Sequence, residues 1–301
     1  MSVTAQMVKD LREKTGAGMM ECKKALTETG GDMQAAIDWL RKKGLSVAAK
    51  KSGRVAAEGK VVAVSSGNAG ILLEVNLETD FASRNEHFGS FIENLSQLVL
   101  KARPADMDAL QALPYGNGRS VAEEVTHLIS VIGENMAVRR YQLMEVAQGV
   151  VGQYIHMNGK IGVLVGLESG GDAAALAELG KQLAMHVAAA SPQFLDRSVV
   201  PVETLNRERD VLMEQAKASG KPENILAKMV EGRISKFYGE VCMLEQLYVV
   251  DQESKVSQVV EQAAKKLGSP IRVTGFARFQ LGEGIQKEEK DFAAEVAQQM
   301  G

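Results

Sequence analysis

The chain has 301 residues, of which 45% are hydrophobic and 24% are charged, and we expect more than one compact globular unit. The net charge of −3 argues against a protein that coats nucleic acid, because that role requires a basic surface. The two cysteines are widely separated, which argues against a disulfide scaffold, and the charged N-terminus argues against a signal peptide. No run of ~18 apolar residues suggests a membrane span. Together these features predict a cytoplasmic protein.

Three short helices are predicted over residues 4–43, where apolar residues recur at helical spacing. Asp32 follows a Gly-Gly break and is a suitable N-cap for the third helix. Residues 44–59 are small, basic and short of large hydrophobic side chains, so we expect a linker there. Residues 1–54 are therefore predicted to form a small helical domain with its linker.

The next segment, residues 55–140, is predicted to form the first half of a core. Two apolar runs flank Ser-Ser-Gly-Asn at 65–68, which is typical of a β-hairpin. An amphipathic helix over 87–102 follows, and a second helix at about 119–133 leads to a strand over 136–146.

The same order returns in residues 141–280. A hairpin around Asn158-Gly159 precedes a helix over 175–192, and a last strand lies within 271–284. The chain is thus predicted to be an α+β protein with a duplicated core of two subdomains, each with an antiparallel sheet.

Extra residues at about 201–240 separate the helix and last strand of the second half. Their apolar spacing and a central Gly-Lys-Pro predict two antiparallel helices in a projecting coiled-coil hairpin. The alternative is that both helices pack on a sheet. After the last strand, 281–301 is predicted as a C-terminal module whose helix carries Phe292 and Val296 on one face.

Signatures of covalent chemistry are missing from the sequence. It has no phosphate-binding Gly-x-x-x-x-Gly-Lys-[Ser/Thr] motif, no cysteine or histidine cluster at metal-ligand spacing, and no evident acid and base pair. We therefore expect no catalytic residue, no metal and no cofactor, and interpret the chain as a binding protein rather than an enzyme.

One stretch, residues 76–88, places a large aromatic residue where a strand should meet solvent. In one interpretation Thr79 or Asp80 caps the next helix and Phe81 packs back on it as a hydrophobic staple. In the other, Phe81 is held outward to enter a partner. The residues alone favour the first.

Six blocks of the sequence together resemble the bacterial elongation factor Ts family over essentially the whole chain. They are residues 11–26, 77–88, 132–140, 159–168, 228–241 and 273–285. The resemblance implies a guanine-nucleotide exchange factor that releases GDP from elongation factor Tu. It also implies a ubiquitin-associated-like (UBA-like) N-terminal domain, a two-part core, a coiled-coil hairpin and a C-terminal module.

The family's central motif is Thr-Asp-Phe-Val, and this chain has Thr79, Asp80, Phe81 and Ala82. By resemblance, Phe81 is a wedge that enters the GTPase near its Mg²⁺ and nucleotide site, and Asp80 positions it. The resemblance thus reverses the preference for a packed ring. Ala82 lacks two methyl groups of the family's valine, which raises the question of what braces the loop.

The resemblance also assigns partner contacts to Met19, Met20 and His156. The implied partner is elongation factor Tu, both GDP-bound and nucleotide-free, with no direct nucleic-acid or membrane contact; a dimer of heterodimers is left open. Two other functions are compatible with parts of the sequence: an adaptor that binds through the N-terminal helices, and a small-molecule enzyme with a polar pocket between the two halves of the core.

Overall fold

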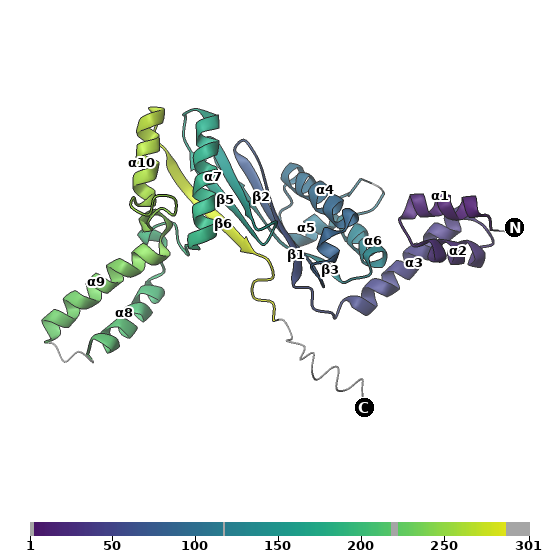
Figure 1. The fold of residues 1–301 in the computed structure, drawn as a ribbon, viewed down its shortest axis with the longest axis horizontal. Coiled ribbons are helices and arrows are strands. Elements are labelled where there is room, and N and C mark those ends of the chain that lie inside the picture. The colour runs from purple at the N-terminus through teal and green to yellow at the C-terminus, as the bar shows by residue number, and fades with distance from the viewer. Residues whose placement is uncertain (1–2, 117, 218–221, 287–301) are drawn as a thin grey trace. The chain divides into compact units, whose positions relative to one another are not determined.

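The computed structural model describes residues 3–116, 118–217 and 222–286. In these residues the chain forms ten α-helices and two three-stranded antiparallel sheets, which confirms the α+β class (Figure 1). None of the helices within these ranges is both long enough and apolar enough to cross a membrane. The helix predicted near the C-terminus falls outside the described residues.

The chain divides into two compact units, and neither is one continuous stretch. The first unit comprises residues up to Val61, then Leu73–Tyr141, and the segment from Gln280. The second comprises Val62–Leu72 and Gln142–Phe279. The first β-hairpin therefore contributes residues to both units.

Three helices open the first unit: α1 (Ala5–Thr15), α2 (Met19–Glu28) and α3 (Met33–Lys51). The Asp32 side chain accepts a hydrogen bond from Ala35 N at 2.8 Å, as predicted for an N-cap. The helices share a small apolar core, formed by Val8, Leu11, Cys22, Ala25, Leu26 and Ala36.

The predicted linker over 44–59 is wrong in its first half, because α3 continues to Lys51. Alanine and lysine favour helix, and tertiary packing adds to that preference. α3 packs on α6 (Val121–Ile132), with Gly44 buried so that a Cβ there would lie 3.5 Å from the Ser130 hydroxyl. The lack of large hydrophobic residues in this stretch thus allows close helix packing.

The first sheet has the order β1 (Glu58–Ser66), β2 (Ala69–Leu77), β3 (Met136–Glu145). Every residue of the central strand β2 is buried. Between β2 and β3 lie α4 (Glu86–Ala102), α5 (Met107–Ala112) and α6. One face of α4 is buried, as its periodicity predicts; its members are Phe88, Phe91, Ile92, Leu95, Ser96 and Val99.

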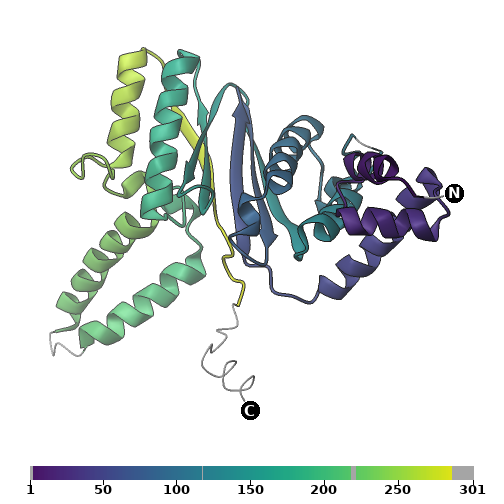
Figure 2. The ribbon, with the colours of Figure 1, turned by 45° about the vertical axis from the view of Figure 1, so that its right-hand side comes forward.

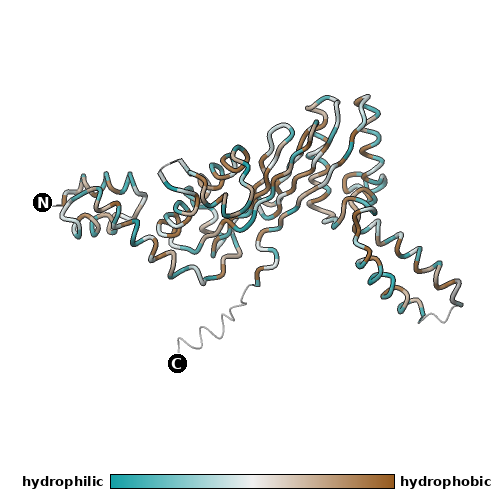
Figure 3. The backbone as a smooth tube through the Cα atoms, turned by 180° about the vertical axis from the view of Figure 1, so that it is seen from behind, coloured by the Kyte–Doolittle hydropathy of each residue, from teal (hydrophilic) through white to brown (hydrophobic). Residues whose placement is uncertain are grey.

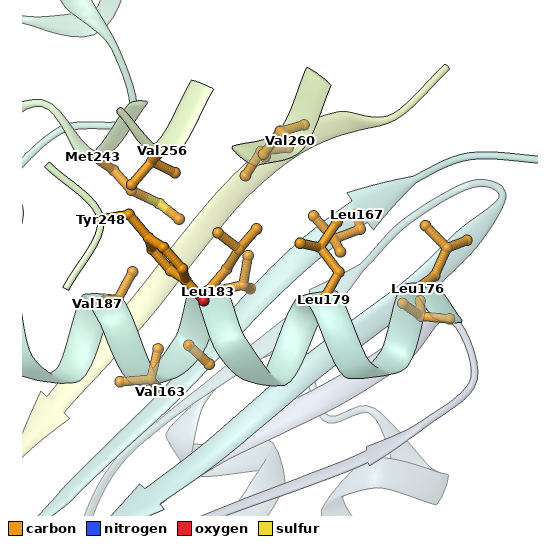
Figure 4. Close-up of a cluster of buried hydrophobic side chains, with 14 of the residues drawn as sticks. Val163, Leu167, Leu176, Leu179, Leu183, Val187, Met243, Tyr248, Val256 and Val260 are labelled. Carbon is orange, nitrogen blue, oxygen red and sulfur yellow. The ribbon is translucent and has the colours of Figure 1, made fainter. Parts of the chain in front are cut away.

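The second sheet has the corresponding order β4 (Gly149–His156), β5 (Ile161–Glu168), β6 (Arg272–Gln280). β4 and β5 pair antiparallel from Gly149↔Glu168 to His156↔Ile161. The helix α7 (Ala173–Ala190) packs on both strands, and α10 (Val256–Leu267) adds to the same core, whose buried side chains meet in Figure 4. Gly152 and Gly180 allow the close approach of β4 and α7.

Two helices, α8 (Val202–Lys217) and α9 (Glu223–Val241), occupy the predicted hairpin region and lie side by side in Figures 1 and 2. Their buried cluster comes from these two helices alone, namely Leu212, Ala216, Leu226, Val230 and Ile234. Apolar and polar segments alternate along both (Figure 3). The alternative of packing on a sheet is therefore wrong for this face. Val202, the first residue of α8, lies outside this cluster and is 64% exposed.

Candidate partner-binding site

A short corner connects the central strand of the first sheet to α4, and we call residues 78–85 the Phe81 corner. β2 ends at Leu77, and a single 3₁₀ turn covers Ala82–Arg84. α4 then begins at Glu86, with the Asn85 side chain accepting a hydrogen bond from His87 N at 2.9 Å. Asn85, rather than Thr79 or Asp80, is therefore the N-cap of α4.

The ring of Phe81 points away from the protein, and the residue is 77% exposed. Its backbone angles, φ −63° and ψ −47°, are ordinary right-handed values, so the exposure involves no backbone strain. The Arg84 guanidinium lies 5.9 Å from the ring centre, at the outer limit of a cation–π contact. The hydrophobic-staple interpretation is thus wrong, because the ring does not pack on the following helix.

The corner is braced by Glu134, a residue that the sequence analysis did not single out. Thr79 donates to its carboxylate twice, from the backbone N–H at 2.9 Å and from the hydroxyl at 2.6 Å. Glu134 lies between α6 and β3, directly after Gly133, whose φ of 84° ends α6. The sequence signal that could have pointed to Glu134 is the Gly-Glu-Asn triplet at 133–135, at the end of the helix predicted at about 119–133.

The side chains of Asp80 and Ser83 make local contacts within the corner. The Asp80 carboxylate accepts from Arg84 at 3.3 Å, but the two side chains are 48% and 73% exposed, so this pair adds little stability. The Ser83 hydroxyl donates to the Asp80 carbonyl at 2.6 Å. Ala82 is half-buried, and its N–H donates to the Thr79 hydroxyl at 3.2 Å. The brace therefore does not use the Ala82 side chain.

The other predicted contact residues lie on different elements. Met19 and Met20 are the first residues of α2 and are 59% and 73% exposed. His156 is the last residue of β4, in the second unit, and is exposed, with its Nδ1 3.1 Å from the Tyr154 hydroxyl. Of the predicted contact residues, therefore, only Thr79, Asp80, Phe81 and Ala82 lie together, because they are consecutive in the chain.

The family model for elongation factor TS matches residues 78–283, which is more than half of the chain and includes the Phe81 corner from its first residue. The chain belongs to the elongation factor Ts family. It is 61% identical to an elongation factor Ts of Magnetococcus marinus, over 99% of this chain and 98% of the relative. The corresponding protein of Rhodospirillum centenum is 59% identical over 99% of both chains.

This membership confirms the resemblance drawn from the six sequence blocks. A more distant elongation factor Ts, from Syntrophotalea carbinolica, is 52% identical over 99% of both chains, so the match extends over nearly the full length. Membership in this family supports a nucleotide-exchange-factor role in translation elongation.

The strands on either side of the corner, β2 and β3, are also joined by a buried carboxylate. Glu74 on β2 is fully buried and accepts hydrogen bonds from Arg139 at 2.9 Å, Arg140 at 2.6 Å and the Gly282 N–H at 2.8 Å. Burial by itself would raise the pKa of this carboxyl, but the three donors outweigh burial and hold the pKa below its usual value. The cluster ties the segment after β6 to β2 and β3.

Proposed function

We propose that this chain promotes the release of GDP from elongation factor Tu, and that Phe81 acts as a wedge at the partner's Mg²⁺ and nucleotide site. Family membership supports the exchange role. The observation that supports the wedge is the outward Phe81 side chain on a corner whose backbone is held by Glu134. No covalent step is involved.

The exchange role follows from linkage between two ligands of one GTPase. A factor that binds the nucleotide-free form more tightly than the GDP form weakens GDP binding by the same factor. Mg²⁺ is a sensitive point, because it requires nearly ideal octahedral geometry. An aromatic ring that displaces the groups around the ion would weaken both ion and nucleotide, with Asp80 beside the ring to orient it.

The ring alone supplies only part of the required free energy. Burying one phenylalanine side chain contributes roughly 1.5–3 kcal/mol, or about one to two powers of ten in an equilibrium constant. A tightly held nucleotide requires more, so we assign further partner contacts to Met19, Met20 and His156. The two methionines are exposed at the start of α2, where they are free to be covered by a partner.

The predicted domain plan belongs to the same proposal. Residues 1–54 would act as a UBA-like domain, 55–140 and 141–280 as the two core subdomains, and the α8–α9 pair as a coiled-coil hairpin. Residues 281–301 would form a C-terminal module. Contacts spread over such modules supply the area that a single ring lacks, whether one complex or a dimer of heterodimers forms.

Stopped-flow release of a fluorescent GDP analogue from elongation factor Tu tests the proposal. The chain should accelerate release, and Phe81→Ala should slow the accelerated rate by about ten-fold or more. Val250→Ala is the matched control, because Val250 is also an exposed hydrophobic residue, at 66%. Equal rates for the wild type and Phe81→Ala would remove Phe81 from the mechanism, and no acceleration at all would reject the exchange role.

A further inference from the structure

The direction of the Phe81 ring is set by the backbone of the corner. With 77% of the residue exposed, the ring itself has little packing to hold it. The 3₁₀ turn that follows has only three residues, which is too short to be rigid alone. Contacts to the backbone on either side of Phe81 must therefore orient it.

One set of these contacts runs through Thr79 and ends at Glu134, outside the corner. The hydroxyl of Thr79 donates to the Glu134 carboxylate at 2.6 Å and accepts from the Ala82 N–H at 3.2 Å. The Thr79 N–H donates to the other carboxylate oxygen at 2.9 Å. The Glu134 carboxylate thus fixes Thr79, two residues before Phe81. Through the Thr79 hydroxyl it also fixes Ala82, the residue just after Phe81.

The loop that carries Glu134 is itself held in place. The N–H of Asn135 donates to the Glu78 carboxylate at 2.6 Å, and its side-chain amide donates to the carbonyl of Arg54 at 2.8 Å. Lys51 donates to the carbonyl of Gly133. The carboxylate is therefore presented from a fixed backbone rather than from a free side chain on a loose loop.

We propose that Glu134 is a positioning residue for nucleotide exchange: it pre-organises the Phe81 corner, so that the ring enters the partner without first being ordered. This inference rests on the proposed function of Phe81. Pre-organisation removes the cost of ordering the corner, and here that cost would fall on the step in which the ring enters the nucleotide site. Other contacts dock the factor, so the loss of Glu134 acts within the docked complex. If the corner then occupies its competent conformation for only a fraction of the time, the ring displaces the nucleotide in only that fraction of complexes, and the maximal release rate falls accordingly.

A positioning role and a merely structural role change different kinetic quantities. Loss of positioning lowers the maximal rate of GDP release at saturating factor, because the bound ring is placed correctly less often. Partial unfolding lowers the concentration of active factor instead. It therefore raises the half-saturating concentration and leaves the maximal rate unchanged.

Glu134→Ala should lower the maximal release rate by about ten-fold, which is the typical equilibrium value of a hydrogen bond to a charged group. The half-saturating concentration should stay within about three-fold of the wild-type value, which corresponds to about half of the free energy of a ten-fold change. Glu134→Gln should retain most of the activity. Its amide oxygen can accept from the Thr79 N–H, while its NH₂ group donates to the Thr79 hydroxyl, which has two lone pairs.

Glu168→Ala is the matched control, since Glu168 also accepts from a backbone N–H, that of Ala147, and from a side chain, Arg272. Its maximal release rate should equal that of the wild type. Thermal unfolding of each variant, followed by circular dichroism, accompanies the kinetics. A Glu134→Ala variant that shows only a raised half-saturating concentration would overturn the positioning role.

Combining Glu134→Ala with Phe81→Ala separates this inference from the proposed function. If Glu134 acts through the ring, the double variant should release GDP as slowly as Phe81→Ala alone, without a further drop. A further drop of the same size would show that Glu134 acts independently of the ring and would overturn the inference. If Phe81→Ala slows release and Glu134→Ala does not, only the positioning role fails; if Phe81→Ala is normal, the wedge itself fails.

Discussion

Replacing Glu74 by glutamine should destabilise the first unit by about 3 kcal/mol, the lower end of the cost of breaking a buried ion pair. We choose the lower end because the two arginine side chains are 27% and 31% exposed, so water replaces part of what they lose. Glutamine keeps the shape of the side chain but removes the charge. It also turns one acceptor into a donor that faces other donors, Arg139, Arg140 or the Gly282 N–H.

Hydrogen–deuterium exchange with mass spectrometry is the suitable assay, because it reports opening of each segment separately. Amides in β2 and β3 of the Glu74→Gln variant should exchange faster, by about two powers of ten for 3 kcal/mol. Peptides from β5, in the other unit, serve as an internal reference. The control variant Glu283→Gln alters the other carboxylate bound to Arg140, at 3.2 Å, but Glu283 is 52% exposed, so its loss should cost less than about 1 kcal/mol.

The effect should also depend on pH, with a defined sign. Because the folded-state pKa of Glu74 lies below its usual value, its contribution to stability is complete above the unfolded-state pKa of about 4.3. The contribution is lost as the pH falls through the folded-state pKa. The difference between wild type and Glu74→Gln should thus be constant near neutral pH and shrink below about pH 4.3. A difference below about 1 kcal/mol at pH 7 would refute the view that this carboxylate joins the strands.

Two further substitutions test local features of the chain. Ala82→Val introduces the valine that the resemblance implies at this position. It should change the GDP release rate by no more than about two-fold in the stopped-flow assay, because the hydrogen bonds through Glu134 do not involve that side chain. A ten-fold gain would show that the corner is poorly held without the valine. Gly152→Ala should lower the free energy of chemical unfolding by about 1–3 kcal/mol, because the new Cβ would lie 2.4 Å from the backbone carbon of Gly180. Gly232→Ala in α9, where nothing lies within 4 Å, should instead raise it by about 0.5–1 kcal/mol, and equal effects of the two would contradict the close-approach argument.

Local signals in the sequence predicted much of the fold correctly. Asp32 caps its helix because an N-cap depends only on a side chain and the next three residues. The hairpin around 65–68 and the antiparallel pair α8 and α9 follow from residues adjacent in the chain. The C-terminal extent of α3 was not predicted, because Gly44 packs against Ser130 of α6, which is 86 residues further along the chain.

The candidate site, like the fold, was predictable from the sequence only in part. Its residue types were recognisable from the stretch at 76–88 and from five other blocks, and the family followed from them. The outward direction of Phe81 could not be decided, since a cap with a packed ring and a braced corner with an exposed ring fit the same local pattern. The deciding contact joins Thr79 to Glu134, which are 55 residues apart.

The sequence by itself therefore determined the family, the α+β class and the choice of Phe81 as the candidate residue, because these depend on residue types and short-range spacing. Only the tertiary structure decided that the ring faces outward, that Glu134 holds its corner, and that a buried Glu74 joins the strands beneath. Each of these depends on hydrogen bonds between segments far apart in the chain, and a pattern of neighbouring residues carries no information about which distant donor or acceptor will meet them.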